Sequence, residues 1–255
     1  MTLLLDVTDV SKRFGGVQAL ENVGLQVPRG SIVGLIGPNG AGKTTFFNVI
    51  TGLYPADAGM FLFDGVAYSP ESVANVTKAG LARTFQNIRL FGEMTVLENV
   101  MVGCHCRSRS GLLGAIFRLP STKKEERAIS EKSRLLLAYV CLSEYADMQA
   151  RNLSYGHQRR LEIARALATE PKLLALDEPA AGMNATEKLD LRELLLRIRA
   201  DGTTILLIEH DVSLVMGICD NLTVLDYGKV IATGKPADVR SHPEVIRAYL
   251  GQGAV

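Results

Sequence analysis

The stretch Gly37-Pro-Asn-Gly-Ala-Gly-Lys-Thr-Thr45 follows directly on the apolar run Ser31-Ile-Val-Gly-Leu-Ile36. This order predicts a loop at the point where a buried strand turns into a helix. Its glycines let the backbone curl, so that consecutive N–H groups and the positive end of the helix converge on phosphate oxygens. The stretch therefore predicts a phosphate-binding loop, and hence a protein that binds a nucleoside triphosphate.

Two side chains add chemistry to the backbone of this loop. Lys43 supplies a mobile positive charge, and the hydroxyl of Thr44 suits Mg²⁺, which completes the pattern G-x-x-x-x-G-K-[ST]. The alternative, an ordinary glycine-rich turn, is disfavoured by the strand and helix on either side. We predict that the whole loop binds nucleotide, through Gly37, Pro38, Asn39, Gly40, Ala41, Gly42, Lys43, Thr44 and Thr45.

Two adjacent acids end a second apolar strand, Leu173-Leu-Ala-Leu-Asp-Glu-Pro179. Asp177 is placed to hold Mg²⁺, directly or through water, because neutralising the β- and γ-phosphates requires that ion. Glu178 can orient or deprotonate water in line with the γ-phosphate, while Lys43 and Mg²⁺ take up charge on the transferring group. The alternative is a solvated turn after a strand. Together with the phosphate loop, the two acids predict an enzyme that hydrolyses the nucleotide.

Composition excludes several classes of protein. The chain has 255 residues, of which 47% are hydrophobic and 22% charged, as is ordinary for a globular protein with a substantial core. Its net charge of +1 gives no overall basic field, so the charge does not point to a nucleic acid partner, and we expect none, although local basic patches are compatible with this charge. No apolar run approaches the roughly 20 residues of a membrane span. The start, Met1-Thr-Leu-Leu-Leu-Asp-Val7, lacks a basic leader and a cleavage site, so we expect a cytoplasmic protein.

The cysteines do not show the spacing of a metal site. Cys104-His-Cys106, Cys141 and Cys219 form no C-x-x-C pair and no series of zinc ligands. A metal site or a disulfide among them is the less favoured alternative. We expect buried, reduced thiols that act as small core residues.

Hydrophobic periodicity predicts two strand-rich blocks around a helical insert. The first block has strands at 3–10, 22–27, 31–36 and 60–63, a helix from the phosphate loop to about 51, and a strand ending near 84. The pattern is helical from 96 to about 170, with amphipathic stretches at 123–140 and 154–169. Apolar strands return at 173–177, 203–208 and 222–225, separated by helices at 185–200 and 212–219, which is typical of a parallel sheet covered on both faces.

A third motif, Leu153-Ser-Tyr-Gly-His-Gln158, opens the second amphipathic stretch and places Ser154 at its N-terminal end. The N-terminal end of a helix attracts anions. Serine is also the commonest helix cap, so Ser154 taken alone is better explained as a cap. The meaning of the motif therefore depends on the others.

Taken in order, these motifs resemble those of the ATP-binding subunit of an ABC transporter, over nearly the whole chain. Residues 37–45 resemble the Walker A loop, 173–178 the Walker B strand with the catalytic Glu178, and 153–158 the signature loop. The resemblance implies an α/β P-loop NTPase fold with a mixed core sheet flanked by helices, an antiparallel β subdomain and an inserted α-helical subdomain. It implies one domain over 1–255, with a catalytic core at 1–95 and 171–240, a helical signature subdomain at 96–170 and a C-terminal tail at 241–255.

Three residues gain a role only from this resemblance. Gln86 in Arg83-Thr-Phe-Gln-Asn87 resembles the Q-loop glutamine, which meets Mg²⁺ or the attacking water. His210 resembles the switch histidine that contacts the γ-phosphate, and Phe14 resembles the aromatic residue that stacks on adenine. The resemblance therefore implies ATP and Mg²⁺ as cofactors, with Lys43, Gln86, Glu178 and His210 in catalysis and Thr44, Gln86 and Asp177 at the metal.

The same resemblance implies a site shared between two ATP-binding subunits. In the family, subunits pair head to tail, and each signature loop closes over ATP held by the other subunit. Here that loop comprises Ser154, Tyr155, Gly156 and His157. Hydrolysis would then open the dimer, and attached membrane subunits would convert this change into transport.

Departures from the commonest family pattern indicate a subgroup. Tyr155, the run Arg159-Arg-Leu-Glu162 and the run Ala180-Ala-Gly-Met-Asn184 are similar to the ATPases of branched-chain amino acid importers. This similarity implies a second ATPase subunit, either a distinct relative or a second copy of this chain, together with two permease subunits and an extracytoplasmic solute-binding protein. It places the chain at the cytoplasmic face of a bacterial inner membrane. Amides, urea or similar small solutes are alternative cargoes. The insert at 103–121 would lie near the membrane subunits or pack on its own subdomain.

Other classes of protein fit the sequence less well. The ATPase of a lipopolysaccharide exporter shares much of this pattern and is the main alternative. A soluble ABC protein of DNA repair or translation would carry a long coiled-coil insert or two cassettes. A nucleotide switch that does not hydrolyse ATP is disfavoured by intact Lys43, Asp177, Glu178 and His210.

Overall fold

The computed structural model describes residues 2–106 and 120–250, and within them a six-stranded sheet forms the centre of the protein. The strands lie in the order β10-β9-β3-β8-β7-β6, and all neighbours are parallel except β9 and β10. Their bounds are β3 (Ile32–Ile36), β6 (Leu81–Arg83), β7 (Leu173–Asp177), β8 (Thr204–Ile208), β9 (Asn221–Asp226) and β10 (Lys229–Gly234). The sheet is therefore mixed, as the resemblance implies.

The central strands are apolar throughout because both faces of the sheet are covered. Along β3, Ile32 and Ile36 pack into one hydrophobic core while Val33 and Leu35 pack into the other. Strands β7 and β8 alternate in the same way. Since successive side chains of a strand point to opposite faces, a strand buried on both sides shows no polar alternation. The predicted parallel strands are thus confirmed.

A second, antiparallel sheet packs over one face of the first. It has the order β2-β1-β4-β5, with β1 (Leu3–Phe14), β2 (Val17–Pro28), β4 (Ala58–Phe63) and β5 (Val66–Ala67). Helix α1 (Lys43–Ile50) lies between the two sheets, where Phe46 and Phe47 are fully buried. This arrangement places the start of α1, and with it the phosphate loop, at the junction of the two sheets.

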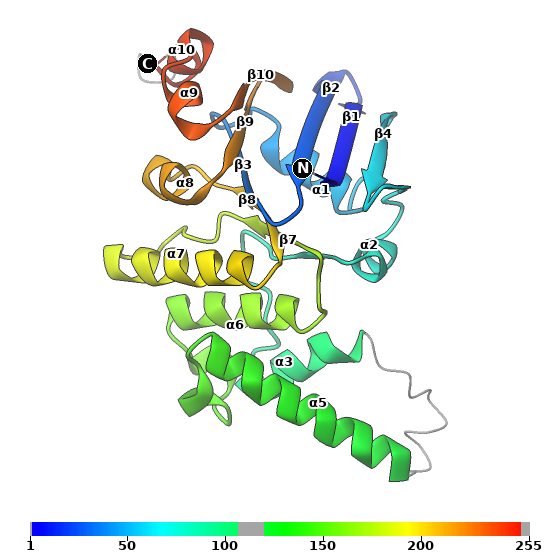
Figure 1. Cartoon of the computed structure of the whole chain (residues 1–255), viewed down its shortest axis with the longest axis vertical. Coiled ribbons are helices and arrows are strands. Elements are labelled where there is room, and N and C mark those ends of the chain that lie inside the picture. Colours follow the sequence, from blue (N-terminus) through cyan, green and yellow to red (C-terminus); the bar gives the residue numbers. More distant parts are fainter. Residues whose placement is uncertain (1, 107–119, 251–255) are drawn as a thin grey trace.

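The helical insert lies at the opposite end of the molecule from the C-terminal helices (Figure 1). It contains α3 (Val96–His105), α5 (Pro120–Tyr139), α6 (Tyr155–Leu167) and the 3-10 turns η1 (Ser143–Tyr145) and η2 (Ala150–Asn152). A capping box between Thr95 and Glu98 fixes the start of α3. Residues 107–119, which include most of the insert predicted near the membrane subunits, lie outside the described residues.

Five further helices complete the described part of the fold. They are α2 (Val73–Ala79), α7 (Ala185–Ala200), α8 (Val212–Ile218), α9 (Pro236–Arg240) and α10 (Pro243–Leu250). Two of them, α7 and α8, pack on the face of the central sheet opposite α1. The predicted C-terminal helix is confirmed as α10, which packs on β10 and α9 through the buried Val245. Among the described residues, no helix combines the length and the apolar character needed to cross a membrane.

The structure also adds elements and corrects one prediction. Periodicity did not reveal α2, α9 or β10, which are short or only partly buried. The expectation of four buried thiols is wrong for Cys106 and Cys141, whose side chains are exposed, while Cys104 and Cys219 are buried. Cys106 follows the last turn of α3, and Cys141 has a left-handed φ of 60° in the turn after α5, so both lie at element ends that face solvent.

Candidate functional site

The phosphate loop requires glycine at two positions for steric reasons. Gly37 has a φ of 151°, and a Cβ added there would lie 2.1 Å from the carbonyl oxygen of Leu225. Gly42, the N-cap of α1, has a φ of 100°, and its Cβ would lie 2.9 Å from the carbonyl oxygen of Ala19. Both the backbone angle and the neighbouring strands exclude a side chain. The loop is therefore packed tightly against β2 and β9.

Lys43 holds its charge inside this loop. Its Nζ donates to the carbonyl oxygens of Gly37 (2.7 Å) and Pro38 (2.8 Å). Burial lowers the pKa of Lys43, and the nearby carboxylates of Glu178 and Asp177 act in the opposite direction. The ammonium group is therefore held against the backbone of the loop.

A cavity of about 540 Å³ opens over the loop, a size that suits a small-molecule ligand. Its lining comes from the loop itself, from Gln86 and Glu178, and from two segments that the sequence analysis did not select. These segments are the start of β2, with Val17, Gln18 and Ala19, and the β9–β10 turn, with Tyr227 and Gly228. In the sequence, the glycine at position 228 is the one sign that this turn is special. In the structure, the N–H of Gly228 donates to the carbonyl of Ala41 in the loop at 2.9 Å.

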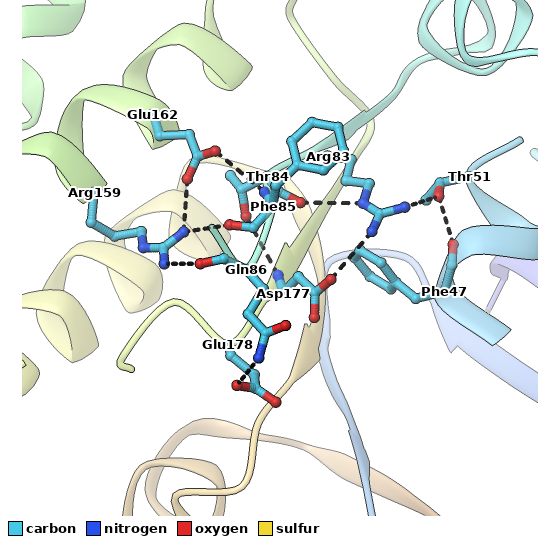
Figure 2. Close-up of polar contacts among 10 residues, drawn as sticks. All are labelled: Phe47, Thr51, Arg83, Thr84, Phe85, Gln86, Arg159, Glu162, Asp177 and Glu178. Atoms are coloured by element: carbon cyan, nitrogen blue, oxygen red, sulfur yellow. Dashed lines mark hydrogen bonds and ion pairs between the residues drawn. The ribbon is translucent and has the colours of Figure 1, made fainter. Parts of the chain in front are cut away.

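Asp177 ends β7 and is buried, with 2% of its surface exposed. Figure 2 shows its carboxylate facing the guanidinium of Arg83, with Nη2 and Oδ2 3.2 Å apart. Burial raises the pKa of Asp177, and the charge of Arg83 counteracts that rise. Arg83 also donates to Thr51 Oγ1 at the end of α1 (2.7 Å) and lies over the ring of Phe47. An arginine that ends the otherwise apolar strand β6 was a signal for this ion pair.

Glu178, Gln86 and His210 lie together, although 92 positions separate the first two in the chain. The Nε2 of Gln86 donates to Glu178 Oε2 at 2.9 Å, and His210 Nδ1 lies 3.6 Å from the same oxygen. Glu178 adopts a left-handed φ of 47°, held by a bond from its N–H to the carbonyl of Ile208 (2.9 Å). The three polar side chains selected from separate motifs thus converge beside the cavity.

Glu209, which the sequence analysis did not select, organises the loop that carries His210. Its fully buried carboxylate accepts hydrogen bonds from the N–H groups of Ala180 (2.8 Å), His210 (3.1 Å) and Asp211 (3.3 Å). Burial raises the pKa of Glu209, while these hydrogen bonds oppose the rise. The carboxylate therefore ties the segment after Glu178 to the segment around His210.

Phe14 lies apart from the other selected residues. Its ring packs edge-on against Tyr54 with centroids 5.4 Å apart, Lys12 Nζ lies 5.4 Å from its centroid, and it does not line the cavity. Its expected contact with adenine stays a prediction.

The signature residues also lie away from the cavity of their own chain, since none of them lines it. Ser154 caps α6 by accepting from the N–H of His157 (3.4 Å), so its capping role is confirmed. A Cβ on Gly156 would lie 2.5 Å from Glu187 Oε1, the side chain that forms a capping box with Asn184 at the start of α7. Tyr155 is exposed, and the ring of His157 lies 4.8 Å from that of Tyr145.

Comparisons with known proteins agree with this geometry. Residues 20–181 match the ABC transporter family, and residues 229–255 match a family described as branched-chain amino acid ATP-binding cassette transporters. The chain is 46% identical to the high-affinity branched-chain amino acid transport ATP-binding protein LivG of Escherichia coli K12 and 44% identical to BraF of Pseudomonas aeruginosa, covering 98% of each chain in both cases. It is 37% identical to a probable LivG of Archaeoglobus fulgidus over 97% of this chain and 95% of that one.

Solved structures lead to the same family. A crystal structure of an ABC transporter cassette in its ADP conformation superposes with a TM-score of 0.86 at 36% identity, covering 98% of this chain and 100% of that chain. A nucleotide-free cassette gives a TM-score of 0.85 at 35% identity, covering 97% and 99%. The dimeric structure of a bacterial ABC transporter cassette gives a TM-score of 0.77 at 25% identity, covering 91% and 98%. The chain belongs to the ABC transporter family, as one of its ATP-binding, ATP-hydrolysing cassettes.

Proposed function

We propose that this cassette powers an importer of branched-chain amino acids, or of similar small solutes such as amides or urea. The observation that carries the proposal is the identity of 44% to 46%, over 98% of the chain, to proteins named for branched-chain amino acid transport. The relatives reported above all carry such names, in bacteria and archaea alike. None is named for lipopolysaccharide export, so the exporter alternative is not favoured.

The phosphates of ATP would be held by the loop between Gly37 and Thr45. The fit rests on the absence of side chains at Gly37 and Gly42, which lets the loop pack tightly against β2 and β9 in its curled form, and on the buried ammonium of Lys43. Thr44 and Thr45, in the first turn of α1, line the same cavity, and the N-terminal end of a helix favours negative charge. Lys43 would exchange its bonds to loop carbonyls for bonds to phosphate.

Thr44, Gln86 and Asp177 would hold Mg²⁺. Thr44 and Gln86 line the cavity, and Asp177 directly precedes Glu178, which also lines it. Hydroxyl, amide and carboxylate oxygens are the hard donors that this ion prefers. Mg²⁺, when bound, supplies neutralising charge to the β- and γ-phosphates. Before Mg²⁺ binds, Arg83 would keep the Asp177 carboxylate ionised and oriented.

Glu178 would orient and deprotonate the attacking water. Its carboxylate already accepts from Gln86, and His210 lies within reach of the same oxygen, so both neighbours would fix its direction. His210 would contact the γ-phosphate, and Lys43 would stabilise charge on the transferring group. The three residues selected from different motifs would therefore act on one reacting centre.

A second ATP-binding subunit would complete the site. Ser154, Tyr155, Gly156 and His157 line no part of the cavity in their own chain, yet Ser154 presents a helix N-terminus, which binds anions well. A head-to-tail pair would bring this loop over the ATP of the other subunit, in line with the dimeric cassette structure at 25% identity. The second subunit would be a distinct relative or a second copy.

Of the two permease subunits, one would dock on this cassette, in a groove of about 600 Å³ lined in part by Phe85, and the other would dock on the second ATP-binding subunit. The groove is lined by residues of α2, α3 and α6 and of the segment 81–91, and most of these side chains are apolar. Gly103 and Cys106, at the start of the insert expected near the membrane, also line it. Docking there would place the chain peripherally on the cytoplasmic face of the membrane, and a solute-binding protein on the far side would supply the cargo.

An uptake experiment tests the cargo. Deletion of this chain from its native cell should abolish uptake of radiolabelled leucine, isoleucine and valine, but not of lysine. The intact chain should restore uptake, and Glu178→Gln should not. Unchanged uptake of all three branched-chain amino acids would overturn the cargo assignment and leave the ATPase assignment standing.

A further inference from the structure

We infer that Arg159 and Glu162 act as a buried clamp on the backbone of Phe85 and Gln86, and that they are positioning residues for the Gln86 side chain. The inference rests on the proposed role of Gln86 at the hydrolytic centre. Both clamp residues lie on α6, and the guanidinium and carboxylate are paired at 2.8 Å with 0% and 1% of their side-chain surfaces exposed. They belong to the subgroup run Arg159–Glu162, for which the sequence suggests no role.

The clamp holds both sides of one residue. The N–H of Phe85 donates to Glu162 Oε1 (3.3 Å), and Arg159 Nη1 donates to the carbonyl of Phe85 (2.6 Å). Arg159 Nη2 donates to the carbonyl of Gln86 (2.8 Å). Figure 2 shows the two side chains reaching from α6 to this short segment. The backbone that carries Gln86 is therefore attached to the helical subdomain.

Thr84, the residue before Phe85, is bonded to the central sheet instead. The N–H of Thr84 donates to the carbonyl of Ala175 in β7 (3.0 Å), and Thr84 Oγ1 accepts from the N–H of Asp177 (3.4 Å). The change of attachment, from sheet to α6, thus falls between Thr84 and Phe85. This lies earlier in the chain than the subdomain boundary at residue 96 expected from the sequence.

From its clamped backbone, Gln86 reaches back to the sheet. Its Nε2 donates to Glu178 Oε2 at 2.9 Å, so one side chain bridges the helical subdomain and the proposed catalytic carboxylate. A rotation of α6 would move the backbone of Gln86 with it and alter this contact. The position of the signature helix, which starts four residues before Arg159 at Tyr155, would then set the geometry around Glu178.

The bonding of Arg159 indicates positioning rather than stability. Burying two charges is costly, and a pair of this kind adds little to stability unless every polar atom is satisfied. Arg159 Nε is buried without a hydrogen-bond partner among the described residues, whereas both terminal nitrogens are directed at residues 85 and 86. The contribution of this ion pair is therefore to fix the backbone of Phe85 and Gln86 through the two terminal nitrogens of Arg159.

A double-mutant cycle on the full chain tests the inference. Arg159→Lys keeps the charge opposite Glu162 but cannot form the two-pronged grip on both carbonyls. In the native background we expect kcat for ATP hydrolysis to fall by about 10- to 100-fold, since a displacement of a positioned group by about 1 Å can cost about 10²-fold. In a Gln86→Ala background the same change should reduce kcat less than about twofold. Binding of a fluorescent ADP analogue should be retained, because the clamp does not touch the phosphate loop.

The neighbouring Arg160 is a matched control. Its Nη2 pairs with Asp190 at 2.5 Å, and no contact joins it to Phe85 or Gln86 in the described part of the chain. Whatever Arg160→Lys does to kcat, it should do equally in both backgrounds. If Arg159→Lys also acts equally in both, the clamp does not work through Gln86 and the inference is wrong, while the proposed function stands.

Two further measurements keep the outcomes distinct. If Gln86→Ala leaves kcat unchanged, the assigned role of Gln86 fails and the inference fails with it. The double variant Arg159→Met/Glu162→Leu removes both charges, and proteins commonly tolerate such a replacement of a buried ion pair. It replaces Arg159→Lys as the test if that single variant does not fold. It should speed amide hydrogen exchange in peptides covering Phe85 and Gln86 without nucleotide, and unchanged exchange there would contradict the clamp.

Discussion

The contact between Arg83 and Asp177 should couple the stability of the protein to its proposed metal site. The two side chains are 9% and 3% exposed and lie 3.2 Å apart, and Arg83 also donates to Thr51 Oγ1 at 2.7 Å. Arg83→Met would leave the Asp177 carboxylate buried and unpaired. Loss of one member of a buried pair costs about 3–5 kcal/mol. We therefore expect the free energy of unfolding to fall by about that amount.

A double-mutant cycle separates the ion pair from the other contacts of Arg83. In an Asp177→Asn background, the carboxylate charge is gone, and Arg83→Met should cost only about 1–2 kcal/mol for the lost hydrogen bond to Thr51. The two single changes should thus be coupled by about 2–3 kcal/mol. The assay is urea unfolding of the full chain in EDTA without nucleotide, so that no ligand contributes.

Arg89→Met is the matched control for this cycle. Arg89 lies over the ring of Phe85 at 4.3 Å and lines the same groove as Arg83, but it makes no contact with Asp177 among the described residues. Its exposed position limits the expected loss to about 1 kcal/mol. An equal cost of Arg83→Met in the presence and absence of the Asp177 carboxylate would refute the reasoning.

Two further predictions concern the backbone of the loop and the response to pH. Gly37→Ala should cost about 2–5 kcal/mol, combining the strain of its φ with the clash against Leu225, whereas Gly40→Ala, with a φ of 78° and no atom within 4 Å of a Cβ, should cost only about 1–2 kcal/mol. Thermal or urea unfolding measures both, and equal costs would contradict the role of packing. Burial raises the pKa of Glu209, so the folded protein binds that proton more tightly than the unfolded chain does, and Glu209 favours folding fully below its ordinary pKa of 4.5. The stability of the native chain relative to Glu209→Gln should therefore decline as the pH rises from below 4.5 through the raised pKa. Urea unfolding of both proteins at a series of pH values measures this difference in the free energy of unfolding, and a difference that does not change with pH would argue against the prediction.

Local signals in the sequence were sufficient for the loop and the two acids. The glycine pattern before Lys43 needs a particular backbone, and the run of apolar residues before Asp177 needs a strand buried on both faces. Each of these requirements is met within a few residues of the chain. The central strands and the helices α1 and α7 could be predicted for the same reason.

Contacts between distant segments could not be read from the sequence. Arg83 and Asp177 are 94 positions apart, and Arg159 and Phe85 are 74 apart, so no periodicity places them together. Glu209 was overlooked beside His210 because its three hydrogen bonds appear only once the loops fold back on each other. The short helices α2 and α9 carry few buried residues and so leave a weak pattern.

Glu178→Gln tests the central claim most directly, because the side chain keeps its size and loses only its charge and basicity. We expect kcat for ATP hydrolysis to fall by about 10²–10⁴-fold, as for loss of a general base, while a fluorescent ATP analogue still binds. The measurement is steady-state phosphate release beside equilibrium binding on the same preparation. Unchanged turnover would contradict the assignment of Glu178 as the base and, with it, the proposed arrangement of Gln86 and His210 around the attacking water.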